Sequence, residues 1–155
     1  MMAPLVLDLD NELTRTSVHE AAHALIHHYY CHSRVTGIRV SPDGTGRVTM
    51  VPASGATRFT RAVAALSGLA AEEVFGDCSR DGGGRDLKKA RELLGAAYAD
   101  AWLVALGLAR RFEPIIDALA RQLIRRRELD ESEFLALAGP SPRWERPDPA
   151  LAERR

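Results

Sequence analysis

The sequence of 155 residues has little of what marks secreted, disulfide-stabilised or membrane-spanning proteins. Its two cysteines, Cys31 and Cys78, are too few and too far apart for a zinc ribbon, and we expect both to be reduced thiols. Residues 1–9 have no basic segment and only a short apolar patch, unlike a signal peptide. No uninterrupted apolar run approaches the roughly eighteen residues that a membrane span needs. We therefore expect a soluble, cytoplasmic protein.

The sequence also lacks a net charge, because 21 basic residues balance 21 acidic ones. The one basic block, residues 125–127, is followed at once by acidic residues, which indicates a solvated helix face and no nucleic-acid partner. A Walker motif and internal repeats are missing as well. The length fits a single domain, which we assign to residues 1–138, with residues 139–155 as a Pro-rich charged tail of poor order.

The most informative motif is HEAAH at residues His19–His23. Two imidazoles four residues apart lie on one face of a helix, where they can share a metal ion. Zinc binds neutral His nitrogen, and a catalytic zinc usually has three protein ligands and a water. Glu20 lies about 100° round the helix from His19, where it can take a proton from that water. The motif predicts zinc as the cofactor and Glu20 as the general base; the alternative is a half-buried helix with a coincidental His pair.

Three further histidines compete as ligands. His27 continues the face of His19 and His23, but at 1.5 Å per residue it lies roughly 12 Å from His19 along the helix axis. One zinc with bonds near 2 Å does not reach all three. We expect His28 and His32 at the solvated end of the helix, or bonded to a carbonyl there. The third ligand must come from elsewhere in the chain.

The periodicity predicts a mainly α (α+β) fold in which a small hairpin lies beside the zinc-binding helix. The first helix starts at Asp10 or Asn11 and runs to about Cys31, although Ser17 and Glu20 also fit a capping box that would start it later. Two strands, 35–40 and 48–51, follow, joined by a turn. This hairpin either covers the core or binds an extended peptide as an added strand.

The second half of the chain is predicted to be helical. A Gly-rich turn at residues 77–85 separates two long helices, and Asp86 at the start of the second either caps that helix or reaches the metal. Gly107 is predicted to bend the chain. The expected helices span residues 57–75, 87–106, 114–127 and 130–137.

Three motifs in this order resemble the peptidase domain of the FtsH family of ATP-dependent zinc proteases. Residues 19–24, HEAAHA, match the family's HEAGHA; residues 67–76 are similar to its GGRAAEE and FG; residues 84–90, GRDLKKA, resemble its GASNDLxxAT segment. The closing segment 123–137 is similar to the family's last helix pair. The resemblance, which covers about residues 12–138, implies a zincin-like domain with His19, His23 and Asp86 as zinc ligands, and it implies hexameric assembly.

The sequence departs from the family at several points. Ala22 stands where the family has Gly, Leu69 stands where it has Arg, and the loop before Asp86 is longer. Glu72 or Glu73 is the alternative third ligand. We expect these two side chains instead to orient a metal-binding residue through a hydrogen bond, or to face solvent. The family's membrane segments and ATPase ring have no counterpart in these residues.

Three functions are compatible with these patterns. The first is a zinc metalloendopeptidase, a hydrolase that cleaves extended or unfolded polypeptides, delivered where needed by a separate ATPase. The alternative is a catalytically weak or inactive metal-binding regulatory module of the same fold, which a closed four-ligand site would favour. An intact Glu20 favours the first. Zinc hydrolysis of a non-peptide substrate is a third reading, which a deep closed pocket would favour.

Overall fold

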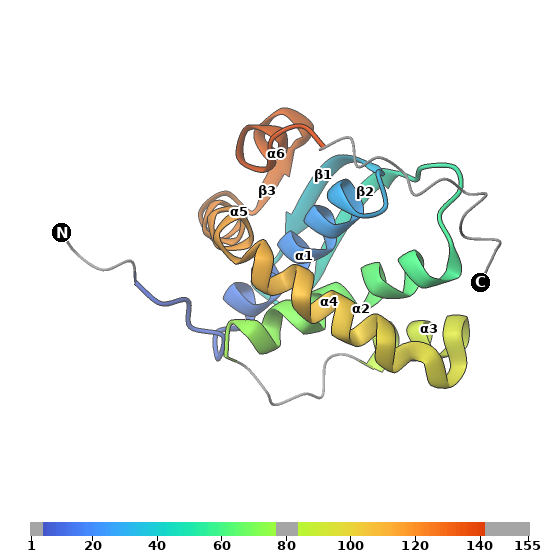
Figure 1. The fold of residues 1–155 in the computed structure, drawn as a ribbon. Helices are drawn as coiled ribbons and strands as arrows, with labels where there is room; N and C mark the ends of the chain where they lie inside the picture. The colour runs from blue at the N-terminus through green and yellow to red at the C-terminus, as the bar shows by residue number, and fades with distance from the viewer. Residues whose placement is uncertain (1–4, 77–83, 142–155) are drawn as a thin grey trace.

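The computed structural model describes residues 5–76 and 84–141, and in this part of the chain it is mainly helical with a small antiparallel sheet (Figure 1). The predicted fold class is therefore confirmed. The helices are α1 (Glu12–Tyr29), α2 (Arg58–Val74), α3 (Gly84–Leu94), α4 (Tyr98–Arg111), α5 (Glu113–Arg126) and α6 (Glu131–Ala138), with a 3-10 turn, η1, at Gly95–Ala97. The strands are β1 (Arg34–Val40), β2 (Gly46–Val51) and β3 (Glu128–Asp130).

Helix α1 lies at the centre of the fold, with the sheet on one side and α2 on the other (Figure 1). Most of its apolar residues, among them Val18, Leu25 and Ile26, are fully buried, because α2, α5 and the sheet cover most of its surface. Helix α2 is in turn covered by α3 and α4. A helix enclosed in this way exposes only one strip to solvent, and that strip carries His19, Glu20 and His23.

Helix α1 starts where Asn11 was predicted to cap it. The Asn11 side chain accepts a hydrogen bond from the Thr14 backbone N–H at 3.1 Å, which satisfies one of the free donors of the first turn. The capping box at Ser17 and Glu20 is wrong, because Ser17 is fully buried in the middle of the helix.

The predicted hairpin is part of a three-stranded sheet in the order β2-β1-β3. Strand β3 pairs antiparallel with β1, with Leu129 opposite Ile38. Residues 128 and 129 were predicted as the junction of two helices and Asp130 as the start of the second, since three residues are too few for a strand periodicity to appear. Helix α5 ends at Arg126, and the φ of 67° at the next residue, Arg127, turns the chain into the strand.

The single helix predicted at residues 87–106 is also wrong. Gly95, with a φ of +58°, ends α3, and after the turn η1 the chain continues as α4 to Arg111. Gly107 does not bend the chain but lies inside α4. The bend forms at Gly95 because a left-handed φ breaks the helical hydrogen-bond pattern, which a glycine with ordinary helical angles does not.

Residues 84–111 are also long and apolar enough for a membrane span by length and composition, with a mean hydropathy of 1.3 over the best eighteen-residue window. In this fold α4 packs along α2 through Ala101 and Ala105, which are fully buried, while Leu103 is 66% exposed. The expected absence of a membrane span and the cytoplasmic location stay predictions.

Candidate metal centre

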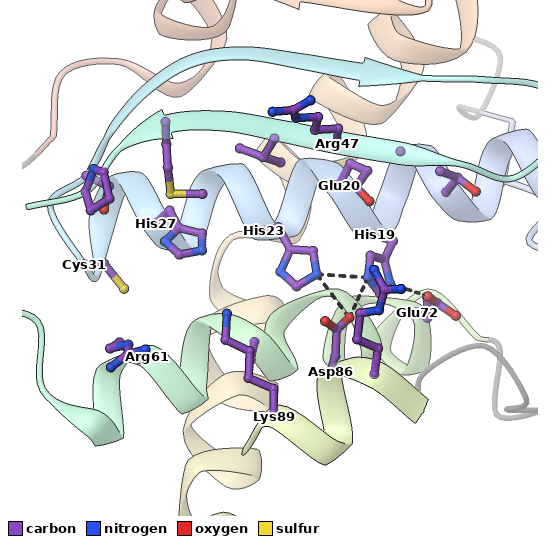
Figure 2. Close-up of a pocket in the computed structure, with 18 of the residues that line it drawn as sticks. His19, Glu20, His23, His27, Cys31, Arg47, Arg61, Glu72, Asp86 and Lys89 are labelled. Carbon is purple, nitrogen blue, oxygen red and sulfur yellow. Dashed lines mark hydrogen bonds and ion pairs between the residues drawn. The ribbon is translucent and has the colours of Figure 1, made fainter. Parts of the chain in front are cut away.

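The exposed strip of α1 forms the floor of a cleft of about 1070 Å³ (Figure 2). Strand β2 forms one wall, and α2 and α3 form the other. The cleft contains every residue that the sequence predicted for the site: His19, Glu20, His23 and Asp86.

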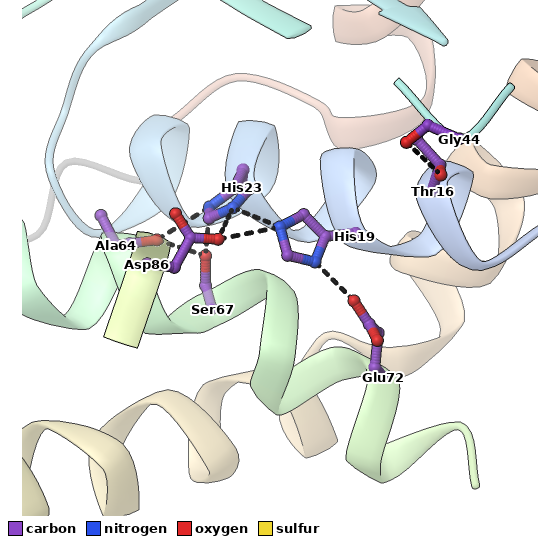
Figure 3. Close-up of polar contacts among 8 residues, drawn as sticks. All are labelled: Thr16, His19, His23, Gly44, Ala64, Ser67, Glu72 and Asp86. Atoms are coloured by element: carbon purple, nitrogen blue, oxygen red, sulfur yellow. Dashed lines mark hydrogen bonds and ion pairs between the residues drawn. The ribbon is translucent and has the colours of Figure 1, made fainter. Parts of the chain in front are cut away.

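Three side chains meet at one point in the cleft (Figure 3). His19 Nε2 lies 2.9 Å from His23 Nε2 and 3.0 Å from Asp86 Oδ2, and the His23 Nε2 to Asp86 Oδ2 distance is 3.4 Å. Two ligand atoms that each bind a tetrahedral zinc at about 2.0–2.1 Å are separated by roughly 3.3 Å. The three donor atoms lie close to this spacing, two of the pairs slightly nearer together, and this group could hold one small metal ion.

The contacts behind the rings fix which nitrogen of each imidazole faces that point. His23 Nδ1 lies 2.9 Å from the Ala64 carbonyl oxygen, which only accepts, so Nδ1 carries the proton. His19 Nδ1 lies 2.6 Å from Glu72 Oε1, a carboxylate acceptor, and carries a proton for the same reason. Both Nε2 atoms are therefore held toward the cleft as ligand atoms, the arrangement that outer contacts give to metal-binding histidines.

The local charges of the site favour a cation. Burial lowers the pKa of the His19 imidazole, but its contacts with Asp86 and Glu72 outweigh this and raise that pKa to about 9. Burial raises the pKa of the Asp86 carboxyl, yet the hydrogen bonds from His19 and His23 hold it well below its usual range. A proton shared among these groups occupies the position that a metal ion would take.

Glu20 lies beside this group without belonging to it. Burial raises the pKa of its carboxyl, and the neighbouring histidines lower it by a smaller amount. A carboxylate with a raised pKa accepts and returns a proton more readily at neutral pH than an ordinary surface Glu does.

Two glycines make room for these side chains. A Cβ at Gly46, the first residue of β2, would lie 2.4 Å from Glu20 Cγ, and a Cβ at Gly68 in α2 would lie 2.5 Å from His19 Nε2. Neither glycine was predicted as a site residue. Gly68 lies within the segment that resembles the family's second motif. A glycine is needed there because α2 approaches the His19 imidazole closely, and this contact is visible only in three dimensions.

The remaining candidates lie elsewhere in the site or outside it. Glu72 contacts the back of His19, as was expected of one of the two glutamates, and Glu73 is exposed. His27 lines the cleft but does not join the group of three.

His28 is buried and donates to the Gly139 carbonyl at 2.8 Å, one of the two roles predicted for it. His32 ends the turn after α1 with a φ of 55°.

Of the two cysteines, Cys31 is a free buried thiol, as predicted, and burial raises its pKa to about 11. Cys78 and most of the Gly-rich turn, residues 77–83, lie outside the described residues, as does the tail from residue 142 onward.

No protein-family model matches the sequence, and no curated protein matches it either.

Proposed function

We propose that this protein is a zinc-dependent metalloendopeptidase that resembles the FtsH peptidase domain. The observation that carries the proposal is the convergence of His19, His23 and Asp86 on one point, with Glu20 beside it. A bound zinc ion would supply Lewis-acid chemistry, lowering the pKa of a water and polarising a peptide carbonyl.

The residues of the chain have separate roles in this reaction. Glu20 takes a proton from the attacking water and then donates it to the leaving amine. Glu72 and the Ala64 carbonyl hold the two imidazoles in the orientation that presents Nε2. Asp86, from α3, supplies the third ligand.

Strand β2 gives the substrate a place to bind. It is the last strand of the sheet order, so its outer edge is unpaired within the described residues, and Val48 and Met50 line the cleft. An extended peptide can add to such an edge through main-chain hydrogen bonds, which supports a polypeptide substrate. The cleft therefore accepts extended or unfolded segments, and folded substrates require a separate ATPase to deliver them.

The alternative of a closed structural metal site has less support. A structural zinc site normally has four protein ligands, and the group found among residues 5–76 and 84–141 has three. A structural site also has no use for a carboxylate of raised pKa beside its ligands.

The test is cleavage of a labelled unstructured protein by the zinc-loaded wild type, Glu20→Gln and Glu73→Gln. Removing a general base typically lowers kcat/KM about 10²- to 10⁴-fold, so we expect that loss for Glu20→Gln with zinc affinity unchanged. Glu73→Gln, which alters an exposed carboxylate on α2, is expected to behave as the wild type. Equal cleavage by all three proteins would contradict the assigned role of Glu20.

A further inference from the structure

The two ends of the cleft differ in charge. Toward the start of α1 the lining includes the carboxylates of Glu12 and Asp43. The turn that holds Asp43 is fixed there, because Thr16 Oγ1 donates to the Gly44 carbonyl at 3.1 Å (Figure 3). Arg15 and Arg47 line the cleft on this side as well, so its charges are of both signs.

On the other side of His23 the cleft is lined by His27, Cys31, Arg61 and Lys89 (Figure 2). The described lining residues of this half include no carboxylate. Burial, with His23 and Lys89 nearby, lowers the pKa of His27 to about 4, so the ring is neutral and the positive charge comes from the two exposed cations. We call this half of the cleft, beyond His23, the basic half.

Both cations lie one helical turn from groups that hold the metal centre. Lys89 follows Asp86 by three residues on α3, and Arg61 precedes Ala64, whose carbonyl holds His23, by three residues on α2. Residues three apart lie on the same face of a helix, about 4.5 Å apart along its axis. Arg61 and Lys89 are therefore close to the reacting bond of a bound peptide and point into the same half of the cleft.

Arg61 and Lys89 form no ion pair with another described residue. Cations outside the cleft are commonly paired: Arg34 bonds Glu131 and Arg39 bonds Glu128, and Lys88, the neighbour of Lys89, lies 3.8 Å from Glu92. Cations that face the part of the cleft whose described lining has no carboxylate are available to a ligand that brings its own negative charge.

We propose that the basic half is a subsite for an Asp or Glu side chain of the peptide substrate; this rests on the proposed peptidase function. From His23 to its end at Tyr29 α1 rises about 9 Å, a length that an extended peptide covers in about three residues. The acidic side chain is therefore within about three residues of the scissile bond. A substrate with Lys or Arg there meets repulsion from both cations.

The test measures binding, so that it does not depend on turnover. Three labelled peptides of one unstructured sequence, with Glu, Gln or Lys at the same positions, are titrated into the zinc-loaded Glu20→Gln protein by fluorescence anisotropy. We expect the Glu peptide to bind about tenfold more tightly than the Gln peptide, since each exposed ion pair contributes a few-fold. This difference should shrink as salt is added.

Matched substitutions assign the preference to its residues. Arg61→Gln with Lys89→Gln is expected to abolish the difference between the Glu and Gln peptides, and Arg58→Gln with Lys88→Gln, which alters exposed neighbours outside the cleft lining, is expected to keep it. Arg61→Glu with Lys89→Glu should reverse the preference toward the Lys peptide, a gain that an unfolded variant cannot produce.

Equal binding of the three peptides, or a preference that survives the Arg61 and Lys89 substitutions, would overturn the subsite. Cleavage without charge preference would leave the peptidase function intact and refute only this inference. Charge-selective binding without any cleavage would support the subsite and contradict the proposed peptidase function.

Discussion

Each histidine on the exposed strip of α1 has a different neighbour, and the neighbour decides its chemistry. His19 and His23 are held by acceptors at Nδ1, whereas His27, one turn further, is half-buried near His23 and Lys89 and has no acidic partner in the described residues. The same side chain therefore presents a free Nε2 to a candidate metal site at two positions and has a lowered pKa at the third. Sequence spacing alone excluded His27 as a ligand but did not predict its protonation state.

The lowered pKa of His27 predicts a pH dependence of stability. Its pKa is about 4 in the folded protein and near 6.5 when unfolded, so between these values the unfolded chain binds more protons. Stability from this residue is thus present above pH 6.5 and decreases as the pH falls toward 4. We expect the unfolding free energy of metal-free wild type to drop by up to about 2 kcal/mol more than that of His27→Gln between pH 7 and pH 5.

Urea unfolding of both metal-free proteins at pH 7, 6 and 5 measures this difference. The two proteins are compared by how their unfolding free energy changes with pH. The substitution also alters packing, but that contribution is the same at each pH. Parallel curves for the two proteins would show that His27 titrates normally in the fold.

Among the elements, the break between α3 and α4 shows how two glycines with similar surroundings differ. A Cβ at either Gly95 or Gly107 would meet nothing within 4 Å, so neither is required by packing. Gly95 has a φ of +58°, whereas Gly107 lies within the helix α4. Backbone conformation alone therefore explains why the helix breaks at Gly95 and continues through Gly107.

This pair predicts opposite effects of the same substitution. Gly95→Ala places a Cβ on a left-handed backbone and is expected to reduce the unfolding free energy by about 1–2 kcal/mol. Gly107→Ala replaces a glycine inside a helix and is expected to raise it by about 0.5–1 kcal/mol. Chemical denaturation measures both, and stabilisation by Gly95→Ala would contradict the position of the bend.

At the scale of the molecule, the candidate metal centre brings together helices that are distant in sequence. His19 and His23 come from α1, which lies in the core, and Asp86 comes from α3, which packs on α2 at the outside. An ion held by all three would tie the outer helix to the core. Metal removal should therefore affect the stability of the whole fold.

We predict that zinc at a hundred times its dissociation constant stabilises the wild type by about 2.7 kcal/mol, a Tm increase of roughly 5–10 °C. Asp86→Asn should lose most of this increase, since an amide is a poor zinc ligand. Asp100→Asn, a substitution of an exposed carboxylate in the first turn of α4, should retain it. Calorimetry with zinc and with a chelator measures the shifts, and an equal zinc response in Asp86→Asn would remove Asp86 from the ligand set.

The sequence by itself determined what depends on neighbours within one or two helical turns. The HEAAH run is helical and presents both imidazoles on one face because that geometry is local, and the cap at Asn11 follows from the same short-range chemistry. Asp86 was one of three acidic candidates from the residues alone, and only the resemblance to a family favoured it.

Tertiary structure decided everything that depends on one element meeting another. Asp86 and Glu72 contact His19 from 67 and 53 residues away, and Gly46 and Gly68 are required by the approach of β2 and α2 to α1. The gathering of Arg61 and Lys89 in the basic half of the cleft arises in the same way. No periodicity encodes these contacts, because they are set by how the helices and the sheet pack around α1.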